Sequence, residues 1–264
     1  SSTEAILSLK NIGIKAIPAT IGLLHHLTTL DLSSNSLAYL SLDLFKLTKL
    51  RCLILSGNNL TFIPGDIEYL KKLTKLDLGN NSIARIQSKF GIVNLRKLKI
   101  LKLYSNSLCK LPKDFGDLQR LAKLSLASNQ FNSFPTQLCA LSHLTKLSLF
   151  SNQLCELPNE IEQIASLVHL ELSCNQLTEL QHSIGALHQL TALRFTRNKI
   201  QQLPNSISQL TSLLSINVTA NEMTVFPEVY DLSHLTFIHC NFNSISYISP
   251  DLSKLQSLVR LSLS

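Results

Sequence analysis

The sequence predicts an α/β solenoid, in which each repeated segment contributes a short strand and a short helical or extended stretch. Two observations carry this prediction: one leucine-rich phrase recurs along nearly the whole chain, and within each phrase the spacing of apolar residues changes from two to three. The 264 residues are 45% hydrophobic and only 16% charged, which is apolar enough for a packed core. The chain is therefore expected to fold by stacking similar segments.

The repeat is counted here from the first leucine of each copy, taken as position zero. The copy at Leu27 reads LTTLDLSSNSLAYL, a degenerate copy begins at Glu4, and a copy cut short begins at Leu258. Most copies span 23 residues, but the copy at Leu73 spans 25 and the copy at Leu213 spans 22. The regular copies begin at Leu27, Leu50, Leu73, Leu98, Leu121, Leu144, Leu167, Leu190, Leu213 and Leu235.

The copies bound the domain organisation. They make about eleven complete repeats and a partial twelfth, so a single domain is expected over residues 1–264. The last letters, LVRLSLS, stop inside a strand phrase, which would leave an apolar layer uncovered. We therefore expect the sequence to be part of a longer chain.

The two parts of each repeat predict different secondary structure. Alternating leucines in LxLxx are typical of a strand with one buried face. In PNEIEQIASL, the apolar residues Ile161, Ile164 and Leu167 recur every three residues, which predicts a short helical turn. Pro158, at the start of this phrase, is expected at the first helical position, where its missing N–H would have no partner anyway.

One asparagine recurs at position eight. A buried amide is tolerable only if it is hydrogen-bonded, and backbone groups that leave a strand need such partners. We therefore expect a structural role, with Ile12 in the first copy as the exception. The residues are Asn35, Asn58, Asn81, Asn106, Asn129, Asn152, Asn175, Asn198, Asn221 and Asn243.

The shared pattern LxxLxLxxNxLxxLPxxIxxLxx resembles the leucine-rich repeat, over essentially the whole chain. The 23-residue length with LPxxIxxL resembles the intracellular Ras-suppressor and plant Ras-group-related subclass, and bacterial repeat proteins that include effectors delivered into host cells. The resemblance implies a horseshoe-shaped solenoid, with a parallel β-sheet on its concave side and short helical or extended segments on its convex side. It also implies an asparagine ladder, and small GTPases or signalling enzymes as partners.

No arrangement of residues predicts catalysis, a cofactor or a metal. His169 and Cys174 share one strand phrase but lie roughly 16 Å apart at about 3.3 Å per residue, too far for a nucleophile and its base. No phosphate-binding glycine loop occurs. We therefore expect no enzyme activity, no cofactor and no small-molecule substrate.

Positions two, four, six and seven are free of the repeat's demands and are expected on the concave face. Lys123 and Lys146 share one column on adjacent strands, which the fold does not require because like charges weaken a sheet. Tyr104 and Phe150 share another column, with a slot over Ala127 between them. The predicted partner-binding residues are Lys75, Lys102, Tyr104, Lys123, Lys146, Phe150, His169, Glu171, Arg194, Arg197, Phe237 and His239.

A structural interpretation of these charges remains open. Asp77 neighbours Lys102 in one column, and Glu171 neighbours Arg194, so these charges can pair internally. Residues 71–123 hold thirteen Lys or Arg and three acids, a net charge of +10, whereas the remaining residues sum to −3. Much of this basic block is expected to be a solvated surface.

These observations predict a non-catalytic protein–protein interaction module, a scaffold in signalling or a delivered effector. The expected partner is a protein with an acidic surface bound on the concave face. One alternative is a substrate-targeting segment of a larger kinase, phosphatase or ubiquitin ligase. Another is binding of nucleic acid or an anionic membrane by residues 71–123. Six scattered cysteines without CxxC pairs indicate reduced thiols, so we expect a location in the cytoplasm, or in the host cytosol for an effector. The sequence does not fix the oligomeric state, and a monomer is the expectation.

Overall fold

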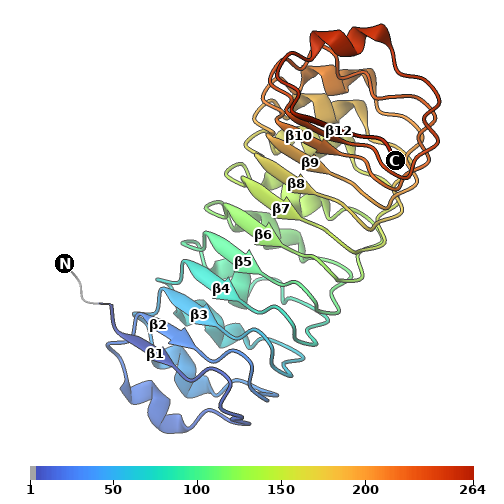
Figure 1. Ribbon diagram of the computed structural model, residues 1–264. Coiled ribbons are helices and arrows are strands. Elements are labelled where there is room, and N and C mark those ends of the chain that lie inside the picture. Colours follow the sequence, from blue (N-terminus) through green and yellow to red (C-terminus); the bar gives the residue numbers. More distant parts are fainter. Residues whose placement is uncertain (1–3) are drawn as a thin grey trace. The chain divides into compact units, whose positions relative to one another are not determined.

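The computed structural model describes residues 4–264 and divides into two compact halves, one up to Gln130 and one from Phe131 (Figure 1). The N-terminal half contains strands β1 to β6 and the C-terminal half strands β7 to β12. Within each half the strands lie parallel and in chain order. Short 3-10 helices line the opposite side of each half from the strands (Figure 1). The α/β solenoid is therefore confirmed.

Every strand is three residues long and covers positions two to four of its repeat. In the N-terminal half these are β1 (Ile6–Ser8), β2 (Thr29–Asp31), β3 (Cys52–Ile54), β4 (Lys75–Asp77), β5 (Ile100–Lys102) and β6 (Lys123–Ser125). In the C-terminal half they are β7 (Lys146–Ser148), β8 (His169–Glu171), β9 (Ala192–Arg194), β10 (Ser215–Asn217), β11 (Phe237–His239) and β12 (Arg260–Ser262). The strands are shorter than the phrase predicted, because position six already lies beyond their ends.

The predicted helical turns are 3-10 helices, as the spacing of three residues indicated. In the N-terminal half they are η1 (Ala19–Leu23), η2 (Leu42–Lys46), η3 (Gly65–Tyr69), η4 (Gly91–Asn94) and η5 (Lys113–Asp117). In the C-terminal half they are η6 (Thr136–Ala140), η7 (Asn159–Gln163), η8 (His182–Ala186), η9 (Asn205–Gln209) and η10 (Pro250–Lys254). Between β10 and β11 the described chain forms no such helix.

The prediction that Pro158 occupies the first helical position is wrong by one residue. Pro158 precedes η7 with φ −78° and ψ 156°, an extended conformation. Its carbonyl accepts the N–H of Ile161 at 3.2 Å, which is the first bond of the helix. Proline fits this position because its ring fixes φ and its carbonyl can accept the first hydrogen bond of the helix. The position does not depend on the N–H that proline lacks. Pro250, inside η10, is the exception.

The core of each half is a stack of leucine layers. In β5 and the residue that follows it, Leu101 and Leu103 are 0% exposed, and in the helix-side segment Phe115 is also 0% exposed. Each fully buried side chain of this size stabilises the fold by about 1.5–3 kcal/mol. The alternation of buried and accessible residues along the strand leaves positions two and four on the sheet face.

The repeated asparagine forms the predicted ladder. The Asn106 amide donates to the carbonyl of Leu103 at 3.1 Å and to that of Leu78, in the preceding repeat, at 3.0 Å. Its Oδ1 accepts the N–H of Ile83 at 2.9 Å. The same three bonds recur at Asn58, Asn175 and other members. The structural role of these residues is confirmed.

Position seven has a backbone conformation that the sequence pattern did not reveal. In each of the eleven complete repeats its φ lies between 50° and 70°, in the left-handed region, although only one repeat carries glycine there. In the ten regular repeats the chain turns at this point and aims the next residue, the ladder asparagine, inward. The residues are Asn11, Ser34, Gly57, Asn80, Ser105, Ser128, Ser151, Cys174, Arg197, Ala220 and Phe242.

Candidate functional site

The sheet face of the C-terminal half carries a hollow of about 370 Å³, called here the sheet-face hollow. Its lining comes from positions two, four and six of consecutive repeats, where side chains leave the strand away from the core. Because all of these repeats share one register, residues from five repeats converge on one place. The lining residues are Phe150, Glu171, Ser173, Arg194, Thr196, Ser215, Asn217 and His239.

Phe150 supplies the aromatic wall of the hollow. It lies two residues beyond β7 and remains 40% exposed. Its carbonyl accepts a hydrogen bond from the Asn152 amide at 3.3 Å, so the ladder holds its backbone in place. A fixed, accessible ring beside polar groups is the kind of residue that anchors protein interfaces.

Glu171 and Arg194 form a pair on the floor of the hollow. Arg194 Nη1 lies 4.0 Å from Glu171 Oε2, across β8 and β9. The other carboxylate oxygen, Oε1, accepts the N–H of Ser173 at 2.8 Å, which fixes the glutamate. The internal pairing that the sequence left open is therefore confirmed. An ion pair this exposed contributes little to stability, so its guanidinium stays available to a ligand.

His169 and Phe237 occupy position two and do not line the hollow. The His169 Nδ1 lies 2.9 Å from the Val168 carbonyl and 3.3 Å from the Thr191 hydroxyl, so its ring is engaged at the start of its own strand. Phe237 is 41% exposed on β11. His239, two residues further along β11, does line the hollow and is half-buried.

Arg197 was predicted at a free strand position and lies beyond the end of its strand. Strand β9 ends at Arg194, and Arg197 sits at position seven with a φ of 53°. It therefore belongs to the left-handed turn that follows the strand. The prediction that position seven is an open strand position is wrong, because the turn needed to bury the ladder asparagine begins there.

In the N-terminal half, Lys102 and Tyr104 are both held by the preceding repeat. Lys102 Nζ lies 3.2 Å from the buried carboxylate of Asp77. The ring of Tyr104 lies over Gly79, so closely that a Cβ added to this glycine would come within 2.3 Å of the ring. Tyr104 is therefore half-buried over the repeat that precedes it, on the side away from Ala127.

The other predicted lysines are separate on the sheet. In the N-terminal half, Lys75 of β4 and Lys123 of β6 both align with Ile100, which lies between them. Lys146 is exposed on β7 in the C-terminal half, as is Phe150 beyond it. The predicted neighbours Lys123 and Lys146 thus belong to different halves, and their pairing stays a prediction, as does the slot between Tyr104 and Phe150.

Four of the twelve predicted residues meet in the sheet-face hollow: Phe150, Glu171, Arg194 and His239. Sequence reasoning did not select the small polar residues that complete it. The signal was present, because they stand in the same free columns as the residues selected, but serine and threonine are so frequent in this chain that they do not stand out. Those residues are Ser173, Thr196, Ser215 and Asn217.

The chemistry of the described residues is that of contact and hydrogen bonding. No group of three or more His, Cys, Asp or Glu in residues 4–264 is placed to hold a metal ion. All six cysteines are free thiols. Burial raises the pKa of Cys139 to about 11, with Glu160 acting in the same direction, and burial raises that of Cys240 to about 12. These two thiols remain protonated at neutral pH and are poor nucleophiles.

Residues 4–264 contain no helix that is long and apolar enough to cross a membrane.

Comparison with known families gives two matches. The model described as "Leucine-rich repeat region" matches residues 76–194 and 130–264, and the model described as "Leucine rich repeat" matches residues 25–83. A search of curated proteins finds no match.

Solved structures with similar folds include bacterial and plant proteins. A leucine-rich repeat protein of Leptospira interrogans is 32% identical, with a TM-score of 0.92 over 96% of this chain and 64% of that protein. The plant peptide hormone receptor RGFR1, solved in complex with RGF2, is 27% identical, with a TM-score of 0.80 over 95% of this chain and 41% of the receptor.

The ectodomain of the receptor kinase GASSHO1/SCHENGEN3 from Arabidopsis thaliana, in complex with CASPARIAN STRIP INTEGRITY FACTOR 2, is 26% identical. Its TM-score is 0.74, over 95% of this chain and 34% of that protein. This chain thus spans less than two thirds of the length of each of these three proteins.

Proposed function

Because this chain belongs to the leucine-rich repeat family, we propose that it is a non-catalytic module that binds another protein through the sheet-face hollow of its C-terminal half. The observation that carries this proposal is the exposed ring of Phe150 beside the accessible guanidinium of Arg194. Phenylalanine and arginine are both enriched in the cores of protein interfaces, and arginine is also frequent among hot spots.

The hollow fits an extended or protruding segment better than a flat surface. Its volume lies at the lower end of the range for pockets that enclose small ligands, and its polar side chains are spaced along successive strands. RGFR1 and GASSHO1/SCHENGEN3 were each solved with a bound ligand, named RGF2 and CASPARIAN STRIP INTEGRITY FACTOR 2. This supports a peptide-like segment of a partner protein as the ligand class here.

We propose further that the partner carries an acidic surface. Lys146 is exposed on β7 near Phe150, and Lys123 and Lys75 add positive charge on the sheet face of the N-terminal half. Such charges increase the rate of encounter with an acidic partner more than they increase final affinity. We propose that this binding serves signalling or a delivered effector and takes place in the cytoplasm. The six free thiols support a reducing compartment.

The test is capture of binding proteins from cytosol by the immobilised chain, followed by affinity measurement with the purified partner. Phe150→Ala should weaken binding at least tenfold, and Arg194→Ala should weaken it severalfold. The matched control is Phe242→Ala, which removes a phenylalanine of 70% exposure from the same half, outside the hollow. If all three variants bind like the unaltered chain, the sheet-face hollow is not the binding site.

A further inference from the structure

The 22-residue repeat that begins at Leu213 differs from its neighbours on the helix side. In the preceding repeat, Pro204 is followed by Ile207 and, six residues after the proline, by Leu210. In the short repeat, Leu232 follows Pro227 after only five residues. The missing residue therefore falls inside the segment that forms a 3-10 helix in the other repeats.

The hydrogen bonds show what the deletion changes. The Ile207 N–H donates to the Pro204 carbonyl at 2.9 Å, a three-residue separation that begins η9. The Val229 N–H instead donates to the Pro227 carbonyl at 2.9 Å, only two residues away, which closes a three-residue turn. Val229 is 0% exposed and fills the inward place that isoleucine holds elsewhere. The core is thus maintained while the helix is lost.

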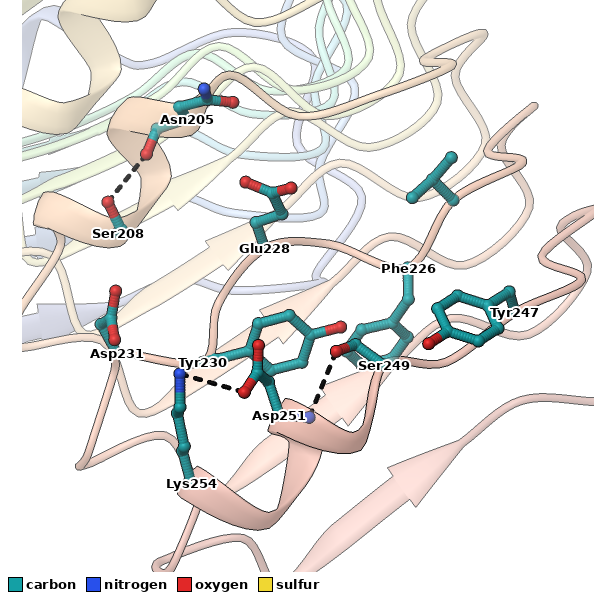
Figure 2. Close-up of a pocket in the computed structure, with 11 residues that line it drawn as sticks. Asn205, Ser208, Phe226, Glu228, Tyr230, Asp231, Tyr247, Ser249, Asp251 and Lys254 are labelled. Atoms are coloured by element: carbon teal, nitrogen blue, oxygen red, sulfur yellow. Dashed lines mark hydrogen bonds and ion pairs between the residues drawn. The ribbon is translucent and has the colours of Figure 1, made fainter.

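The lost helix leaves a pocket of about 420 Å³ between η9 and η10, called here the helix-side pocket (Figure 2). It lies entirely in the C-terminal half, on the opposite side of the repeats from the sheet-face hollow. Its walls come from η9, from the turn of the short repeat, and from the segment that leads into η10. The lining residues are Asn205, Ser208, Val225, Phe226, Glu228, Tyr230, Asp231, Tyr247, Ser249, Asp251 and Lys254.

Aromatic rings form the apolar part of this pocket. The rings of Phe226 and Tyr230 stack at a centroid distance of 6.1 Å and an interplanar angle of 24°. Phe226 is only 2% exposed, whereas Tyr247 is 65% exposed. Figure 2 shows the rings of Phe226 and Tyr230 between Glu228 and the start of η10, with Tyr247 to one side of them. The ring of Tyr247 is therefore accessible to a group that enters the pocket.

The polar part of the pocket is acidic. Glu228, Asp231 and Asp251 contribute three carboxylates against the single ammonium of Lys254, a net charge of −2. Lys254 lies 3.0 Å from Asp251, whereas Glu228 and Asp231 take part in no ion pair within residues 4–264. The hydrogen bond and charge of Asp251 raise the pKa of Lys254, and the charge of Asp231 acts in the same direction. The local potential is therefore negative.

We propose that the helix-side pocket binds a positively charged side chain, lysine or arginine, on an exposed basic segment of a partner protein. Aromatic faces and carboxylates attract a cation together, the first through the ring quadrupole and the second through charge-assisted hydrogen bonds. An anion would be repelled by the carboxylates, and an apolar group would desolvate them without compensation. This site is independent of the sheet-face hollow and does not rest on its proposed function.

The test uses saturation-transfer NMR with three probes: N-acetyl-arginine methylamide, N-acetyl-lysine methylamide and the neutral N-acetyl-citrulline methylamide. The two cations should receive saturation on their side-chain methylenes and titrate with millimolar affinity, at least fivefold tighter than citrulline. The double variant Glu228→Gln/Asp231→Asn should weaken the cations at least fivefold. Tyr247→Ala should weaken them about threefold.

A matched control is Glu160→Gln/Glu162→Gln, which removes two carboxylates from η7 in the same half but outside the pocket. Thermal unfolding of each variant establishes that the fold is intact. The proposal is supported if the pocket variant lowers the affinity for the two cations while the control variant leaves it unchanged. Equal binding of citrulline and arginine, equal effects of the two double variants, or no saturation transfer to either cation would overturn it.

Discussion

The carboxylate of Asp77 on β4 and the ammonium of Lys102 on β5 lie 3.2 Å apart in adjacent repeats. Asp77 is 5% exposed, and its other oxygen, Oδ1, accepts the N–H of Gly79 at 3.2 Å. A buried carboxylate needs such partners, because an isolated buried charge is very costly. Lys102 therefore has a structural role as the counter-charge of Asp77, whether or not it also contacts a partner protein.

Lys102→Ala should lower the free energy of unfolding by about 1–2 kcal/mol, since Asp77 loses its counter-charge while Lys102 itself is partly exposed. Urea denaturation at pH 7 measures this change. Lys123→Ala, on an exposed lysine of the next strand, should cost less than about 0.5 kcal/mol. Adding Asp77→Asn to Lys102→Ala should recover part of the loss; a purely additive cycle would contradict the pair.

Asn106→Ala should lower the free energy of unfolding by about 2 kcal/mol, because the Ile83 N–H loses its acceptor in the core. The Leu78 and Leu103 carbonyls each lose one donor but keep the amides of Asn81 and Asn129. Chemical denaturation of the purified chain measures the effect. Asn59→Ala, at an exposed asparagine of the same half, should change stability by no more than about 0.5 kcal/mol. Equal losses of stability for the two variants would show that the ladder asparagine contributes no more than a surface asparagine.

Substitutions at Ser105 should follow backbone conformation rather than side-chain contacts. Its φ is 51°, so Ser105→Gly should raise the midpoint of urea unfolding slightly, and Ser105→Val should lower stability by about 1–2 kcal/mol. At Ser107, outside the left-handed region, the order should reverse, because glycine there only adds entropy to the unfolded chain. The account would be refuted if the glycine and valine variants had the same order of stability at Ser105 as at Ser107.

The buried thiols should make the chain lose stability at alkaline pH. Their ordinary pKa is 9.0, and the folded chain holds them protonated up to about 11 for Cys139 and about 12 for Cys240. Above pH 9 the unfolded chain therefore loses these protons first, so the free energy of unfolding falls from pH 9 toward 12. The contribution is of the order of 1 kcal/mol per thiol between pH 8.5 and 10.5.

This alkaline loss is isolated by comparison with Cys139→Ala/Cys240→Ala, because every other titratable group is the same in the two proteins. Urea titrations at pH 8.5 and 10.5 should show a smaller decrease in the double variant. Parallel decreases in the two proteins would mean that the buried thiols do not contribute.

The fold could be predicted from the sequence because each repeat obeys two short-range rules. Alternating leucines specify a strand with one buried face, and apolar residues three apart specify a 3-10 turn. Position seven could not be predicted, since serine, alanine, arginine and phenylalanine stand there without a turn signal. Glycine marks the left-handed turn only at Gly57. In the regular repeats the ladder asparagine that follows favours that conformation, but the first repeat adopts it at Asn11 with Ile12 next in the chain.

The candidate site was predictable only in part. Columns of free positions identified Phe150, Arg194 and His239, because register follows directly from the repeat. Side-chain direction did not follow from it: the ring of Tyr104 turns over Gly79, where the absence of a Cβ leaves space, and this depends on the neighbour rather than on the column. The 22-residue spacing of the repeat at Leu213 marked the place of the helix-side pocket in the sequence. That the missing residue would remove a 3-10 helix could not be predicted, because this depends on the hydrogen bonding of the turn.

The turn at Val229 shows that the two sides of a repeat can vary independently. Although the short repeat lacks its helix, Ser215 of β10 still aligns with Phe237 of β11, so the strand register is intact. Removing one residue from a helix of another repeat, such as η8, would be expected to open a comparable recess beside that repeat and leave the sheet undisturbed. Binding sites in such an architecture can thus arise, move or multiply through single-codon deletions, without any redesign of the core.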